Sequence, residues 1–335
     1  HLRQHFAYKE KIVKIINCGG YGNTGCTAQT DFLGDHQGVI GALPPFHELG
    51  ILKCFYSFGG IIVTKQMNVI AKTIKNIKLP NKKELRSSLL GIDPEGQRPV
   101  IGGALAHLEM RQRLNKHYGD IYQTIVEALP DSFEALTQDE LIDAFKTAIE
   151  IFTSGLFKHR DPKEAKKLGV EPDDLIIGFK NDPPGAYPLL NTLLPKGSMS
   201  SAILRDPRDT TYDFNRHYGL GHTFDKVQAH CKHYNSQLNS ARSQIQNWED
   251  KIRECHIVLD FENLVSSEKI QDEYRNRMIG NRDRIRHQFN PELSAENIGH
   301  YTKMQTEFVA YVEEKCMENY NEFRKFLLER EILVD

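Results

Sequence analysis

The most constraining feature of this chain is the stretch 11–33, where an apolar run, a glycine-rich turn and a helix-forming run follow one another. The β-branched run Ile12–Ile16 predicts a buried strand, and Thr27–Leu33 has the composition of a helix. A strand, glycine loop and helix in this order point backbone N–H groups and a helix N-terminus at one spot. That spot attracts an anion, most often a phosphate.

The glycine loop Gly19–Gly25 departs from two common nucleotide-binding patterns. Gly20 and Gly25 have the spacing of G-x-x-x-x-G-K-[ST], but Cys26 stands at the place of the lysine. The letters G-x-G-x-x-G also match from Gly20, yet no clear acidic ribose partner follows at the expected distance. Glycines allow close approach to an anion, and Thr24 and Thr27 offer hydroxyl donors. The loop is therefore either a functional anion site or a tight structural turn.

Composition limits the class of protein and its partners. The 335 residues suit one large α/β domain spanning 1–335, and the net charge of −2 leaves no global field for nucleic acid. No apolar run reaches the roughly 18 residues that span a membrane. The six scattered cysteines form no CxxC pair, so we expect no metal site. The absence of an N-x-[ST] acceptor favours the cytoplasm, with the Golgi lumen after loss of an anchor as the alternative.

The rest of the chain alternates short apolar runs with long helical stretches. Strands are expected at Leu175–Ile177, Ala202–Leu204 and His256–Leu259, whereas Val39–Ile40 is short for a strand. Helices are expected over Ile61–Leu79, Ala104–Leu129, Asp139–Phe152 and Thr210–Trp248 with a break near Gly219, and over the remainder of the chain after the last strand. The last helix carries a core stripe formed by Met304, Phe308, Val312, Cys316, Tyr320, Phe323 and Leu327. The pattern predicts a parallel sheet flanked by helices, with an α-helical insert at about 60–170 as a cap over the strand ends.

Two later strands run directly into charged stretches, Arg205–Asp209 (RDPRD) and Phe261–Val265 (FENLV). Taken in order with the glycine loop, they resemble the sulfotransferases that use 3′-phosphoadenosine-5′-phosphosulfate (PAPS). Phe289–Lys303 resembles the closing loop of that family, so the likeness spans 12–33 and 175–303. The resemblance implies a P-loop-like nucleoside-phosphate-binding core, PAPS as the sulfuryl donor and no metal.

The resemblance also implies roles for individual residues. The first loop of the family holds the 5′-phosphosulfate, and the R-[DN]-P-x-D stretch holds the 3′-phosphate. On this chain the 5′ contacts fall to Gly22, Asn23, Thr24, Gly25, Cys26 and Thr27, and the 3′ contacts to Arg205, Asp213 and Lys303, with His300 as another choice.

Two of these positions depart from the family. Asn23 stands where a basic residue is usual, and Asp213 where a serine is common. A carboxylate there would repel the phosphate, unless Thr210 or Thr211 supplies the hydroxyl.

The general base is sought just after the loop helix. Glu48 and His47 lie there, and Glu48 is preferred because carbohydrate-acting members commonly use a carboxylate. Asp35 and His36 are reserves, and Asn23 is a further catalytic candidate in the loop. His47 as a surface histidine and Glu48 as a turn cap are the alternatives.

Several charged residues have ordinary structural readings as well. Lys180 and Asn181 either touch the sulfate or acceptor or form a turn. Arg205 with Asp206 would form a salt-bridged helix cap, and Arg208 would be solvated or paired with Asp209. The remaining arginines form a solvated helix face or guide an anionic polysaccharide or nucleotide; they are Arg275, Arg277, Arg282, Arg284 and Arg286.

The sequence thus predicts a sulfotransferase that moves a sulfuryl group from PAPS to a hydroxyl of a carbohydrate, such as a polysaccharide under biosynthesis. One alternative is a P-loop kinase or other phosphotransferase, which the missing loop lysine opposes. The other is a non-catalytic nucleotide- or glycan-binding relative, which Asn23 and Asp213 favour. The acceptor and the oligomeric state are left open.

Overall fold

The computed structural model describes a central sheet and most of the helices around it. The described residues are 14–21, 25–41, 119–131, 137–158, 166–170, 174–180, 194–217, 219, 221, 223–246 and 253–335. The helix expected over Ile61–Leu79 lies outside them, as does the whole stretch 60–118 of the predicted insert. The role of the insert as a cap therefore stays a prediction.

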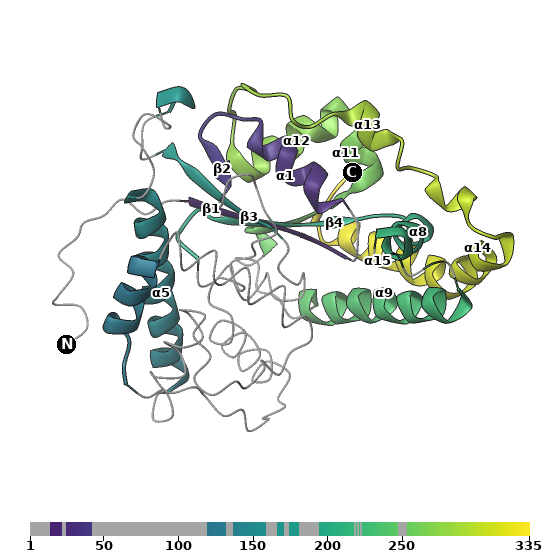
Figure 1. The fold of residues 1–335 in the computed structure, drawn as a ribbon, viewed down its shortest axis with the longest axis horizontal. Helices are drawn as coiled ribbons and strands as arrows, with labels where there is room; N and C mark the ends of the chain where they lie inside the picture. The colour runs from purple at the N-terminus through teal and green to yellow at the C-terminus, as the bar shows by residue number, and fades with distance from the viewer. Residues whose placement is uncertain are drawn as a thin grey trace.

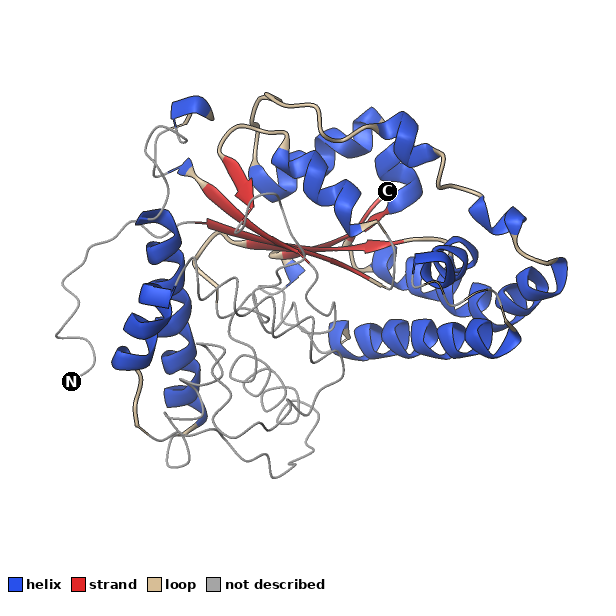
Figure 2. Cartoon of the chain, in the orientation of Figure 1, coloured by secondary structure: helices blue, strands red, loops and turns tan. Residues whose placement is uncertain are grey.

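Within the described residues, six strands form one sheet (Figure 2). They are β1 (Lys14–Gly20), β2 (Val39–Gly41), β3 (Ile176–Lys180), β4 (Met199–Leu204), β5 (His256–Asp260) and β6 (Leu333–Val334). Their order is β2-β3-β1-β4-β5-β6, and every neighbouring pair is parallel. The predicted α/β class with a parallel sheet flanked by helices is confirmed.

The helices follow the strands along the chain. They are α1 (Cys26–Gly34), residues 119–128, α5 (Gln138–Lys158), α8 (Pro207–His217), α9 (Phe224–Ile245), α11 (Phe261–Ser266), α12 (Glu268–Ile279), α13 (Pro291–Ala295), α14 (Thr306–Val312) and α15 (Glu318–Glu329). A 3₁₀ turn η4 (His300–Lys303) precedes α14, and a π-helical turn η5 (Glu313–Met317) joins α14 to α15. None of the helices in the described ranges is both long and apolar enough to cross a membrane.

The helices cover both faces of the sheet because successive strand residues point to opposite sides. Ile16, Ile176 and Ile257 pack with α1, α11 and α12 on one face. Their neighbours Ile15, Ile177 and Val258 pack with α5, α9, α14 and α15 on the other. Figure 1 shows the two helical layers above and below the sheet.

The observed elements differ from the expected ones mainly in their bounds. β1 runs past Ile16 to Gly20, so the first glycines belong to the strand. The expected break near Gly219 separates α8 from α9, and the core stripe from Met304 to Leu327 is buried as predicted. The prediction that helices fill the remainder of the chain is wrong, because Leu333–Val334 adds an edge strand beside β5.

Candidate functional site

The carboxyl ends of β1 and β4 lie side by side at the point where the strand order reverses. β1 leads into α1 on one face of the sheet, whereas β4 leads through α8 into α9 on the other. Gly20 is in register with Ile203, and the Tyr21 N–H donates to the Ile203 carbonyl at 3.2 Å. Open parallel sheets form a ligand-binding crevice at such a point, and here the described start of the glycine loop lies beside the strand that leads into the RDPRD stretch.

The described end of the glycine loop is Gly25, the residue before α1. Its φ of 98° lies in the left-handed region, which favours glycine, and a Cβ there would overlap the ring of Phe261. Gln29 ties α1 to β1 because its Nε2 donates to the Gly19 carbonyl at 2.6 Å. The N-terminus of α1 is thereby fixed at the carboxyl edge of the sheet, and such a terminus attracts negative charge.

A cation reaches this helix start from the neighbouring strand. Lys180, the last residue of β3, is buried and donates from Nζ to Thr27 Oγ1 at 2.8 Å. A lysine therefore stands beside the first turn of α1, although Cys26 and Asn23 occupy the expected basic positions of the loop. The two partners are separated by 153 residues, so only the strand pairing reveals that they meet. Asn181 lies outside the described residues.

Arg205 follows β4 directly and is enclosed by partners. Its side chain is 3% exposed, and Nη1 lies 2.7 Å from Asp213 Oδ2. Nη2 donates to the Asn297 carbonyl at 2.5 Å, and Cζ lies 4.8 Å from the centre of the Phe261 ring. Because Phe261 contacts both Gly25 and Arg205, the FENLV stretch joins the glycine loop to the RDPRD stretch. The alternative reading, a salt bridge of Arg205 with Asp206, is wrong, because the acidic partner of Arg205 is Asp213.

Arg208 also pairs differently from the expectation. It binds Asp206 through Nη2–Oδ2 at 2.6 Å and Glu313 through Nη1–Oε1 at 2.8 Å, not Asp209. Its guanidinium lies 4.2 Å from the centre of the Tyr301 ring. Asp206 Oδ1 accepts the Arg208 N–H at 2.8 Å, so Asp206 caps the start of α8.

Asp209 holds the closing loop, residues 289–303, against α8. Its carboxylate is buried and accepts the N–H groups of Gly299 at 2.8 Å and Tyr301 at 2.9 Å. Burial raises the pKa of Asp209, and the two N–H groups oppose that shift. In the same loop, His300 Nδ1 lies 3.3 Å from Asp213 Oδ1, whereas Lys303 is exposed at the end of η4.

The two threonines proposed as alternative phosphate ligands are used inside their own helix. Thr210 and Thr211 are buried, and both hydroxyls donate to the Pro207 carbonyl, at 3.0 and 2.7 Å. The residue of α8 that pairs with the Arg205 guanidinium is instead Asp213, eight residues after it.

Sequence reasoning missed Glu262 as an ionisable residue of this crevice. It lies in the first turn of α11, and Oε1 accepts the Asp206 N–H at 3.2 Å. Burial raises the pKa of Glu262 to about 7, and the nearby Asp260 adds to the shift. The available signal was a carboxylate placed directly after a buried strand, at the edge where sites form.

The reserve bases lie far from this edge. Asp35 and His36 follow the C-terminal end of α1, at the amino edge of the sheet. Asp35 is fully buried and paired with Arg284 at 2.7 Å, and His36 Nδ1 lies 2.8 Å from the Phe32 carbonyl. Both serve the structure of that edge.

The catalytic candidates Glu48, His47 and Asn23, like Gly22 and Thr24, lie outside the described residues. Among the residues that are described, no three side chains of His, Cys, Asp or Glu gather as a metal site would need.

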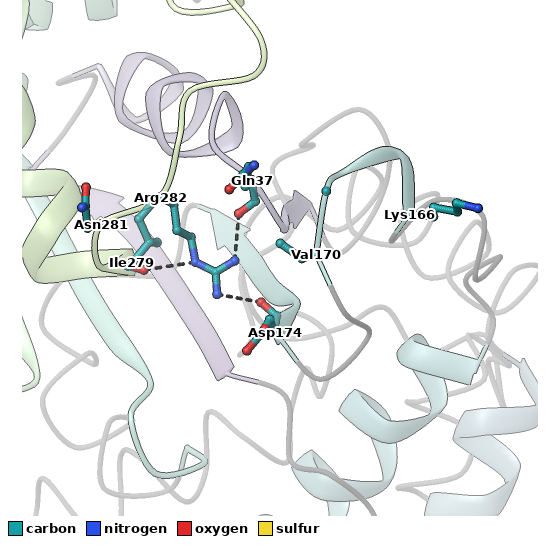
Figure 3. A pocket seen from close by; sticks show the side chains of 8 residues that line it. Gln37, Lys166, Val170, Asp174, Ile279, Asn281 and Arg282 are labelled. Carbon is teal, nitrogen blue, oxygen red and sulfur yellow. Dashed lines mark hydrogen bonds between the residues drawn. The ribbon is translucent and has the colours of Figure 1, made fainter.

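An open hollow of about 680 Å³ also lies at the amino edge, away from the crevice (Figure 3). At its centre the Arg282 guanidinium donates to the carbonyls of Ile279 at 3.2 Å, Gln37 at 2.8 Å and Asp174 at 2.7 Å. Arg282 and Arg284 thus lie beyond the end of α12 and bind neighbouring segments. For these two arginines the expected solvated helix face is wrong.

Comparison with known proteins finds one structural likeness that can be named and no match in sequence. No family model matches the sequence, and no curated protein matches it. The structure is similar to a solved sulfotransferase domain from the curacin biosynthetic pathway, with 10% sequence identity and a TM-score of 0.39. The similarity covers 90% of this chain and 96% of that one. Likeness at this level says nothing about substrate or reaction.

Proposed function

We propose that this chain is a sulfotransferase that moves a sulfuryl group from a nucleotide phosphosulfate to a hydroxyl of a carbohydrate. PAPS is the donor that the sequence resemblance implies. The observation that carries the proposal is that Gly25, at the start of α1, and Arg205, at the end of β4, both lie against the Phe261 ring. Three sequence stretches that are far apart in the chain thereby form one place for a nucleotide.

Each part of the crevice has a role in this reaction. The acceptor oxygen attacks sulfur, the bond from sulfur to the bridging oxygen breaks, and its electron pair stays on the departing phosphate. The start of α1 and Lys180 stabilise the charge that grows on that phosphate and on the sulfuryl oxygens. The acceptor proton goes to a general base, for which Glu48 remains our first candidate and His47 the second.

Removal of the Lys180 charge tests the proposal. We expect wild type to bind adenosine 3′,5′-bisphosphate or adenosine 5′-phosphate below millimolar concentration in calorimetry. Lys180→Met should weaken the tighter of the two by about tenfold or more, because a buried ammonium strengthens charge-assisted contacts. Lys226→Met, an exposed lysine of α9, is the control and should change neither affinity. If wild type binds neither nucleotide at millimolar concentration, the proposal fails.

The second candidate function is a non-catalytic nucleotide- or glycan-binding relative. The ion pair of Arg205 with Asp213 favours it, because the arginine already has an anionic partner. Transfer of labelled sulfate to a panel of polysaccharides separates the two. Binding of nucleotide without any transfer supports the relative, and transfer that is lost in Lys180→Met supports the enzyme.

A further inference from the structure

We propose that Asp213 is a built-in anion for Arg205, so that the chain binds its nucleotide by the 5′ end and selects a free ribose 3′-hydroxyl over a 3′-phosphate. This inference rests on the proposed function and concerns the same crevice. It makes Asp213 a specificity-determining residue and names the donor class as a nucleoside 5′-phosphosulfate without further phosphate.

The contacts of Arg205 leave its charge already balanced. The guanidinium meets the Asp213 carboxylate at 2.7 Å and the Asn297 carbonyl at 2.5 Å, with the Phe261 ring against its face. Arg205 is 3% exposed and Asp213 is 13% exposed. A phosphate that sought Arg205 would have to displace a carboxylate from a nearly dry ion pair, which is unfavourable because the displaced charge would lose its partner.

Further groups hold Asp213 and Arg205 in this pairing. His300 Nδ1 at 3.3 Å and Arg216 Nη2 at 3.6 Å lie near the other oxygen of Asp213. Asp209 and Glu262 lie close enough to Arg205 for its charge to lower both of their pKa values against the effect of burial. A 3′-phosphate that approached Arg205 would therefore meet the Asp213 carboxylate, and juxtaposed like charges are strongly unfavourable.

A ribose hydroxyl suits the same carboxylate. An ionised Asp accepts hydrogen bonds only and has about four lone-pair sites. Carboxylates recognise ribose hydroxyls in other nucleotide-binding sheets for this reason. Asp213 thus offers an acceptor to the 3′-hydroxyl and a repulsive charge to the 3′-phosphate, and specificity arises from both.

Calorimetry with two nucleotides tests this inference. Adenosine 5′-phosphate and adenosine 3′,5′-bisphosphate are titrated into wild type, Asp213→Ser and Asp272→Ser. Asp272 is the matched control because it is an exposed aspartate paired with Arg275 on α12, so its removal changes the net charge equally. We expect wild type to bind the monophosphate at least as tightly as the bisphosphate. Asp213→Ser should shift the affinity ratio towards the bisphosphate by about tenfold or more, and Asp272→Ser should leave it unchanged.

If Asp213→Ser does not fold, the ratio of the two nucleotide affinities in wild type still tests the inference. A bisphosphate that binds wild type more tightly than the monophosphate overturns this inference and leaves the proposed function standing. An unchanged ratio in folded Asp213→Ser also overturns it. If neither nucleotide binds wild type, the proposed function itself fails, and this inference fails with it.

Discussion

Arg205 and Lys180 show what a motif predicts at the scale of single residues. The RDPRD stretch places Arg205 at the carboxyl end of its strand, because an apolar run ends there and a charged one begins. The pairing of Arg205 with Asp213 did not follow, since a motif defines positions and not which neighbour a long side chain selects. Lys180 was a candidate, but its contact with Thr27 depends on the pairing of β3 with β1.

Glu262 provides a test at this scale because its carboxyl group is buried. Its pKa of about 7 lies above the ordinary value of 4.5, so the folded protein binds a proton there that the unfolded chain has lost. The stabilisation that this proton gives the folded state is complete below pH 4.5 and is lost as the pH rises towards 7. Glu262→Gln cannot titrate and keeps an oxygen for the Asp206 N–H. We expect its stability relative to wild type to rise by up to about 3 kcal/mol from pH 4.5 to 7.5.

Urea unfolding of both proteins at several pH values measures this difference. Asp209, whose pKa burial also raises, is present in both proteins, so its contribution cancels in the comparison. A stability difference that stays constant over the range would contradict a buried, proton-binding Glu262.

At the scale of elements, the closing loop is fastened to the start of α8 by several kinds of contact. Asp209 binds its backbone N–H groups, Arg205 binds the Asn297 carbonyl, and Arg208 lies over Tyr301. The loop is therefore held in place by the same stretch that follows β4. The sequence resemblance indicated a closing loop, but it did not indicate that an aspartate of the RDPRD stretch would hold that loop.

Asp209→Ala should release this loop. Two hydrogen bonds from N–H groups to a buried carboxylate are lost, each worth about 1.5 to 3 kcal/mol. We expect the amides of Gly299 and Tyr301 to exchange with deuterium about tenfold faster or more, while the amides of β4 and β5 keep their protection. Asp225→Ala removes an exposed aspartate from α9 and should change neither set. Equal acceleration in the loop and the sheet would instead indicate loss of global stability.

The bounds of elements were less predictable than their existence. Apolar runs marked β1, β3, β4 and β5 because buried parallel strands are continuously hydrophobic. Leu333–Val334 was missed because two residues carry no periodicity. They form a strand only through their pairing with β5. The helical core stripe was correct because burial repeats every three or four residues, even through the π-helical turn η5.

At the scale of the molecule, the two edges of the sheet have different tasks. The carboxyl edge carries Gly25, Lys180 and Arg205 around the crevice between β1 and β4. The amino edge carries the open hollow, where Arg282 joins the end of α12 to the turns before β2 and β3. This hollow thus lies opposite the residues that form the candidate site, and its lining explains it as a structural junction.

Arg282→Met separates these two tasks. The methionine keeps the apolar part of the side chain but leaves three backbone carbonyls without the guanidinium donor. We expect the free energy of unfolding to fall by about 2 kcal/mol, because hydrogen bonds from a charged donor are lost at a partly buried site. Nucleotide affinity should stay within about twofold, since an undisturbed carboxyl edge keeps its hydrogen bonds.

The control is Arg275→Met, which breaks an exposed ion pair with Asp272 on α12 and should lower the free energy of unfolding by about 0.5 kcal/mol or less. A large loss of nucleotide affinity in Arg282→Met, without unfolding, would place the ligand at the amino edge and contradict the assignment of the crevice.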